Sequence, residues 1–179
     1  GKILFQENRL VFAVGQGYVY LPNPYQSSGI TTEPDNGDAT NAFLDGQRVL
    51  VAIERLDEGT NRLKGEFVDL TLTGGKSWNF ANEPSRIYEY ARADPRFEEV
   101  QTYFTVNSVQ EYMHSLGFDD DVPPANGIRD FPSLASAHWN DEDQSFYSTG
   151  DDAIHMGDGG VDDGEDADII VHEFGHAIQ

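Results

Sequence analysis

The sequence contains no cysteine among its 179 residues. This absence excludes disulfide bonds, thiol catalysis and metal sites built on thiolates. Basic residues are also scarce: 11 lysines and arginines stand against 32 acidic residues, so the formal net charge is −21. Such a charge argues against nucleic acid and anionic membrane surfaces and favours solubility or cation binding. No apolar run approaches the length of a membrane-spanning helix. We therefore expect no nucleic-acid partner and no membrane partner.

The acidic residues are concentrated in clusters at residues 119–121, 141–143, 151–152 and 158–168. Clustered carboxylate oxygens can hold calcium, but none of these segments has the twelve-residue spacing of an EF-hand loop. Solvated acidic loops are the simpler interpretation of each cluster.

Apolar residues make up 38% of the chain, which is enough to bury a substantial core. Residues 1–92 are rich in strand-like apolar runs, whereas residues 93–179 combine helical and strand patterns. The expected fold class is α+β, with a β-rich first region, one long helix, a short antiparallel sheet and a terminal helix.

The strand predictions follow from apolar runs bounded by turn residues. Residues 2–21 predict a β-hairpin with its turn at residues 15–17. Residues 25–46 predict a long loop, because Ser, Thr, Asn, Asp, Gly and Pro predominate there. Further strands are predicted at residues 48–56, 63–72, 134–139, 144–148 and 153–156, and the last three are expected to be antiparallel.

The two helices are predicted from their end signals. Asp94 suits the N-cap of the long helix, Pro95 suits its first position, and Gly117 suits its C-terminal end. Before the terminal helix, the acidic residues 162–166 supply an N-cap candidate and suit the positive end of the helix dipole.

The terminal helix carries the pattern His-Glu-x-x-His, at residues 172–176. Four residues advance a helix by slightly more than one turn, so His172 and His176 project from nearly the same face and can meet one metal ion. Glu173 borders that face, where a carboxylate can accept a proton from an attacking water molecule. The pattern predicts a zinc site with two histidine ligands and a general base. The alternative is a chance match in which both histidines are merely packed or solvated.

Segments upstream of this helix carry a family resemblance. They are Ser-Ala-His-Trp-Asn at residues 136–140, Met-Gly-Asp-Gly-Gly at residues 156–160, and Asp168, four residues before His172. Together with the His-Glu-x-x-His pattern, this order resembles the thermolysin-like zinc metallopeptidases, or gluzincins, over residues 98–179. Residues 1–15 are similar to the tail of the inhibitory propeptide that precedes such enzymes.

The resemblance implies roles for individual residues. The two histidines of the motif correspond to zinc ligands, and Glu173 corresponds to the catalytic glutamate. Ala137 and Trp139 fall on the edge strand that pairs with an extended peptide substrate. Asp168 matches a calcium-binding aspartate. His138 replaces a phenylalanine of the family, and we expect it to be an ordinary strand residue.

The resemblance further implies a zincin-like amino-terminal lobe and a secreted zinc-dependent metalloendopeptidase that acts on peptide or protein substrates. In the family, the third zinc ligand and the second lobe come well after the second histidine. We therefore expect them to follow residue 179 and expect the isolated chain to have little peptidase activity. His155 or a loop carboxylate is an alternative third ligand. The competing hypothesis is a non-catalytic acidic module that binds calcium or a partner and keeps the motif as a relic.

Overall fold

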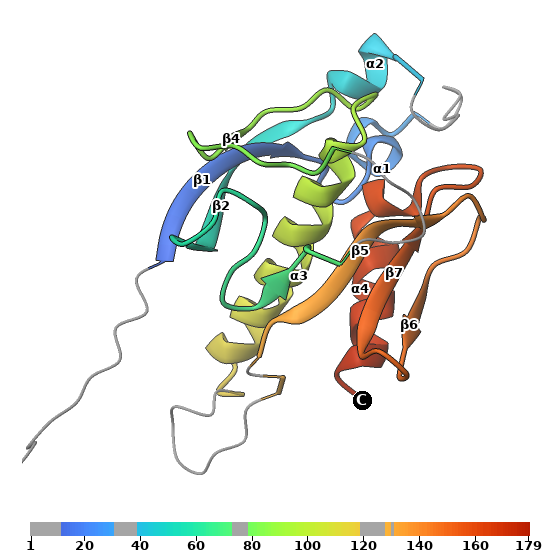
Figure 1. The fold of residues 1–179 in the computed structure, drawn as a ribbon. Coiled ribbons are helices and arrows are strands. Elements are labelled where there is room, and N and C mark those ends of the chain that lie inside the picture. Colours follow the sequence, from blue (N-terminus) through green and yellow to red (C-terminus); the bar gives the residue numbers. More distant parts are fainter. Residues whose placement is uncertain (1–11, 31–38, 73–78, 119–127, 130) are drawn as a thin grey trace, which may run out of the picture.

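The computed structural model describes residues 12–30, 39–72, 79–118, 128–129 and 131–179. Within these ranges the chain has an α+β fold with two mixed β-sheets and the helices α1 to α4. The long helix α3 (Arg96–Ser115) lies between the two sheets and packs against strands of both (Figure 1). The expected α+β class is therefore confirmed, whereas the zincin-like lobe stays a prediction.

The first sheet has the strand order β2-β1-β4. Strand β1 (Phe12–Val19) pairs antiparallel with β2 (Val49–Asp57) and parallel with β4 (Ile87–Tyr88). The strand predicted at residues 48–56 is thus confirmed.

The hairpin predicted over residues 2–21 is wrong in its described part, because residues 15–17 continue β1 instead of forming a turn. Residues 1–11 lie outside the described residues. The glycines that suggested a turn instead allow neighbouring elements to pack closely against β1. A Cβ on Gly17 would lie 2.7 Å from Cγ1 of Val100 on α3, and one on Gly15 would lie 2.6 Å from the carbonyl oxygen of Arg86. The absence of side chains therefore lets β1 approach both neighbours.

The loop predicted at residues 25–46 contains two short helices, α1 (Pro24–Ser28) and α2 (Ala42–Asp45). Asn23 caps α1 by accepting a hydrogen bond from the backbone N–H of Gln26 at 2.9 Å. Asn41 caps α2 in the same way, with bonds from the N–H groups of residues 43 and 44. The polar composition that indicated a loop thus supplies helix caps. Residues 31–38 lie outside the described residues.

The second sheet has the strand order β3-β5-β7-β6. Its members are β3 (Val68–Asp69), β5 (Ser133–Asn140), β6 (Phe146–Ser148) and β7 (Ala153–Gly157). Strand β6 is antiparallel to β7, as predicted. Strand β5, however, is parallel to β7, and β3 is parallel to β5. The expected antiparallel sheet is therefore wrong for β5. The chain leaves β5, forms the outer strand β6 and returns as β7 between the two. Of the strand predicted at residues 63–72, only β3 forms.

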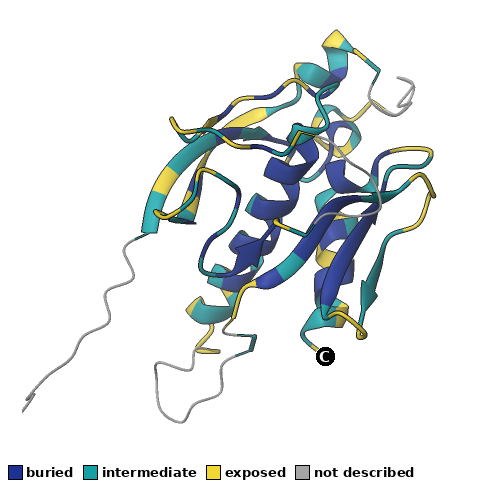
Figure 2. Ribbon diagram, in the orientation of Figure 1, coloured by how far each residue is buried: buried dark blue, intermediate teal, exposed yellow. Residues whose placement is uncertain are grey.

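Helix α3 has the predicted boundaries within two residues. The side chain of Asp94 accepts a hydrogen bond from the N–H of Arg96 at 3.1 Å, and Gly117 follows the helix with φ of +93°. A positive φ is easily adopted by glycine, which explains why the helix ends there. Val100, Tyr103 and further apolar residues of α3 are fully buried, and Figure 2 shows this helix as the buried centre of the molecule.

Helix α4 (Ala167–Ala177) confirms the predicted terminal helix. It follows a short 3₁₀ helix, η1 (Asp163–Glu165), and the side chain of Asp166 caps it by accepting from the N–H of Asp168 at 2.8 Å. Ile170 and Phe174 are buried, and α4 packs against α3, β6 and β7. Among the described residues, no helix is long and apolar enough to cross a membrane.

Candidate metal centre

The two motif histidines converge on the exposed face of α4. The Nε2 atoms of His172 and His176 lie 3.3 Å apart, and the ring planes are nearly perpendicular, at 89°. Two nitrogen ligands of a tetrahedral zinc ion, each 2.0–2.1 Å from the metal, are separated by about 3.3–3.4 Å. The pair therefore has the spacing of two zinc ligands without any rearrangement of the helix.

Glu173 follows His172 directly in the chain but is only 7% exposed. Its surroundings are acidic. Burial raises the pKa of the nearby Asp163, and a hydrogen bond from Ser145 at 2.6 Å opposes this change. The negative charges of Asp143, Asp166 and Glu173 raise the pKa of Asp163 further. The interacting carboxylates create a negative potential beside the histidine pair, and such a potential favours a bound cation.

The histidine pair has no third ligand among the described residues. Neither of the described groups of three or more metal-binding side chains includes His172 or His176. The alternative ligand His155 is buried on β7, where its Nε2 lies 3.1 Å from an oxygen of Asp151. The structure thus contains acidic and histidine groups that could hold a metal, but it does not identify the ion.

The substrate-binding residues inferred from the resemblance lie on β5. Ala137 is 3% exposed on β5, which has β7 on one side and β3 at its start. Trp139, also on β5, packs against His155 with ring centroids 4.0 Å apart and ring planes tilted by 49°, and it contacts Phe146 edge-on. The edge strand beside β7 is β6. Ala137 and Trp139 lie beyond the two residues of β5 that pair with β3. Their role in substrate binding stays a prediction.

Asp168 lies exposed in the first turn of α4. Its carboxylate accepts a hydrogen bond from the side-chain amide of Gln26 at 2.8 Å, which links α1 to the start of α4. Within the described part of the chain, Asp168 does not belong to any group of metal-binding side chains. Calcium at this residue stays a prediction.

A buried ion pair that sequence reasoning missed lies at the start of α3. The Nδ1 of His138 is 2.9 Å from Oε2 of Glu98 and 3.0 Å from Oδ1 of Asp158. Burial lowers the pKa of His138, but the neighbouring carboxylates outweigh this effect and raise it to about 11. Burial raises the pKa of Glu98 to about 8, although the charge of His138 opposes the change. His138 is therefore an ionic partner, not the ordinary strand residue that we expected.

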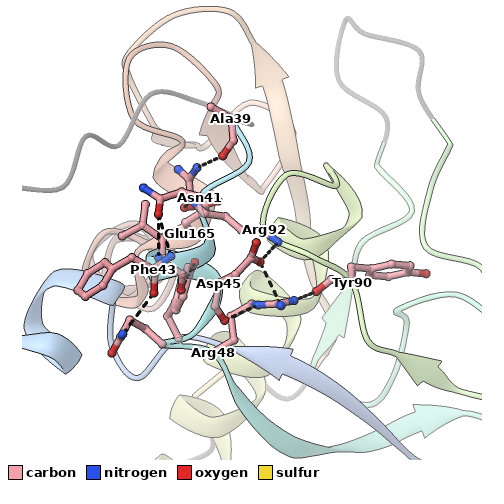
Figure 3. A network of polar contacts seen from close by, with 11 residues as sticks. Ala39, Asn41, Phe43, Asp45, Arg48, Tyr90, Arg92 and Glu165 are labelled. Carbon is pink, nitrogen blue, oxygen red and sulfur yellow. Dashed lines mark hydrogen bonds and ion pairs between the residues drawn. The ribbon is translucent and has the colours of Figure 1, made fainter.

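A second buried ion pair lies beside the first. Arg92 donates from Nε to Oε2 of Glu165 at 2.9 Å and from Nη1 to the carbonyl oxygen of Ala39 at 3.1 Å (Figure 3). Its backbone N–H also donates to the side chain of Asp45. Burial raises the pKa of Glu165, and Arg92 opposes this while other carboxylates reinforce it. These contacts join α2, the strand region near residue 90 and η1.

No protein-family model and no curated protein matches the sequence. The functional argument therefore depends on the geometry of the site.

Proposed function

We propose that this chain forms the zinc-helix part of a zinc-dependent metalloendopeptidase. The observation that carries the proposal is the 3.3 Å separation of the Nε2 atoms of His172 and His176. This spacing fits two positions of a tetrahedral zinc shell, and both rings are exposed to an incoming ion. A catalytic zinc generally has three protein ligands, so one further ligand must come from outside the described residues.

Zinc, when bound, would supply Lewis-acid polarisation of the scissile carbonyl and favour ionisation of the attacking water. Glu173 is the residue that would accept the proton from that water and pass it to the leaving amine. Its place directly after His172 fits this role. Its low exposure restricts the carboxylate to few orientations, which is what a general base requires.

The outer edge of β6 is the surface that we assign to the substrate backbone. An extended peptide can add to an exposed sheet edge as a further strand, using main-chain hydrogen bonds. Helix α4 packs against β6, so a peptide on this edge would lie close to the zinc helix. The contacts of Phe146 with Trp139 and His155 hold β6 in place.

Metal binding tests the proposal directly. We expect isothermal titration and cobalt(II) absorption spectra to show one zinc or cobalt ion bound through imidazole nitrogen, and His172→Ala or His176→Ala to abolish this binding. His114→Gln, on α3, is the matched control and should bind the metal as the parent does. Zinc binding that persists when both motif histidines are replaced would refute the site. Binding of calcium alone would favour the non-catalytic acidic module.

A further inference from the structure

Three buried carboxylates come together between α3 and η1. Glu98 in the first turn of α3, Asp162 before η1 and Glu165 at its end offer ligand oxygens that all lie within 4.8 Å of one another. The three residues are 1%, 3% and 2% exposed. Ionised carboxylates at such distances repel one another strongly when water is excluded. The cluster is therefore stable only with compensating positive charge or with some of its carboxyl groups protonated.

Described cationic side chains contribute to this compensation. Arg92 pairs with Glu165, and His138 pairs with Glu98 and with Asp158. A divalent cation at the cluster would add to this compensation and would favour the ionised forms of Glu98 and Glu165, whose pKa values burial otherwise raises.

Unpartnered oxygen atoms give an independent indication of a ligand. Oε1 of Glu98 and Oε1 of Glu165 are buried, and neither has a hydrogen-bond partner among the described residues. The other oxygen of each side chain faces His138 or Arg92. A buried acceptor without a partner costs about 1–3 kcal/mol, and more when it is charged. A bound cation would remove this cost for both oxygens.

The ligand chemistry favours a hard cation. The Nε2 of His138 faces the carbonyl oxygen of Pro95, which can only accept, so Nε2 carries a proton. Its Nδ1 lies between the carboxylates of Glu98 and Asp158, so His138 acts as a cation and not as a metal ligand. The remaining donors are all oxygen. Calcium takes oxygen ligands at about 2.3–2.6 Å, so oxygens on opposite sides of one ion are about 5 Å apart, which agrees with the cluster.

We propose that Glu98, Asp162 and Glu165 bind a structural calcium ion. The ion would join the first turn of α3 to η1, directly before the zinc helix α4. This inference goes beyond the proposed peptidase function, because it does not involve His172, Glu173 or His176. It also places calcium at residues other than Asp168.

The test uses protein freed of metal by a chelator, in an H172A/H176A background that removes the histidine site. We expect calcium to bind with a stoichiometry of one per chain and, at a hundredfold excess over its Kd, to raise the Tm by about 5–10 °C. Glu98→Gln and Asp162→Asn, which keep the side-chain shape, should weaken binding at least tenfold. Asp168→Asn is the matched control and should bind calcium unchanged.

A second measurement locates the ion without altering the cluster. Manganese(II), used as a paramagnetic substitute in the same background, should broaden the backbone NMR signals of Glu98 and Glu165 while leaving that of Gly59 sharp. The proposal is overturned if calcium does not bind, if Asp168→Asn abolishes binding while Glu98→Gln does not, or if manganese leaves the signals of Glu98 and Glu165 unchanged. Because the histidines are absent in this test, its failure would leave the zinc proposal untouched.

Discussion

Arg92 and Glu165 form an ion pair of 2.9 Å, and their side chains are only 0% and 2% exposed. They are 73 positions apart in the chain. The same guanidinium also binds the carbonyl oxygen of Ala39, so one side chain fixes the segment before α2 against the turn that leads into α4 (Figure 3). The position of α4 therefore depends on a buried charge pair as well as on apolar packing.

Replacement of Arg92 should destabilise the protein severely. Arg92→Met removes one partner of a buried pair and leaves Glu165 uncompensated, which typically costs about 3–5 kcal/mol. Urea unfolding in a chelator-containing buffer measures this loss. Arg96→Met is the control, because Arg96 and Asp94 form a half-exposed pair whose loss should cost less than about 1 kcal/mol. Equal effects of the two substitutions would contradict the structural role of Arg92.

Gly65 should not tolerate any side chain. A Cβ at this position would lie 2.0 Å from the carbonyl oxygen of Arg55 and 2.1 Å from the hydroxyl oxygen of Tyr103. Gly65→Ala must therefore displace either the backbone of β2 or a fully buried ring of α3, and overpacking of this kind costs about 1–3 kcal/mol or more. A lower urea midpoint without loss of the overall circular dichroism spectrum is the expected result. A Gly65→Ala variant as stable as the parent would show that β2 and α3 do not approach Gly65 as closely as described.

Gly175 should respond in the opposite way. It lies within α4, and a Cβ there would meet no atom within 4 Å. Glycine inside a helix is less favourable than alanine by about 0.5–1 kcal/mol, so Gly175→Ala should stabilise the chain by that amount. The measurement is the same urea titration. A decrease in stability would mean that the helix needs flexibility between its two histidines.

The buried tyrosines predict a loss of stability at alkaline pH. Burial raises the pKa of Tyr88 to about 12 from its ordinary value of 10.0, and burial also raises the pKa values of Tyr20, Tyr90 and Tyr103. The folded state thus favours the neutral phenols. The contribution of Tyr88 to stability is complete below pH 10 and is lost as the pH rises through about 12. Thermal unfolding followed over about pH 9–12 measures the loss.

A variant separates this effect from general alkaline damage. Tyr88 donates a hydrogen bond to the carbonyl oxygen of Asn61 at 3.0 Å. Tyr88→Phe should therefore cost about 1 kcal/mol at neutral pH but reduce the further loss above pH 10. Tyr112→Phe, at an exposed position, should change neither quantity. An unchanged pH profile in Tyr88→Phe would remove Tyr88 from the explanation.

The elements with local signals could be predicted from the sequence. Asp94 and Gly117 mark the ends of α3 because capping and a positive φ depend on a few neighbouring residues. The convergence of His172 and His176 is equally local, because helical spacing alone places them on one face. End signals are therefore sufficient to predict the helices, and helical spacing is sufficient to predict the histidine pair.

Features that depend on distant residues could not be predicted. Glycine at position 17 suggests a turn from the sequence alone, because the sequence does not show that α3 packs against this residue. The order of β5, β7 and β6 is not encoded in the alternation of apolar residues, so the parallel pairing of β5 with β7 could not be predicted. The pairing of His138 with Glu98 joins residues 40 positions apart through two separate elements. A buried histidine flanked by acidic segments was the only signal for it.

Glu173 provides the sharpest test of catalysis. In the full-length protein, Glu173→Gln keeps the shape of the side chain but removes the group that accepts the proton, so peptide hydrolysis should fall by about 10²–10⁴-fold. Zinc binding should persist, because the two imidazoles remain. Steady-state hydrolysis of a quenched fluorescent peptide measures the rate, and metal analysis of the same sample measures the zinc. Glu142→Gln, at an exposed acidic residue, is the control and should retain full activity. Turnover that survives Glu173→Gln with zinc bound would exclude Glu173 as the base, whereas loss of zinc would show that this carboxylate supports the metal and not the proton transfer.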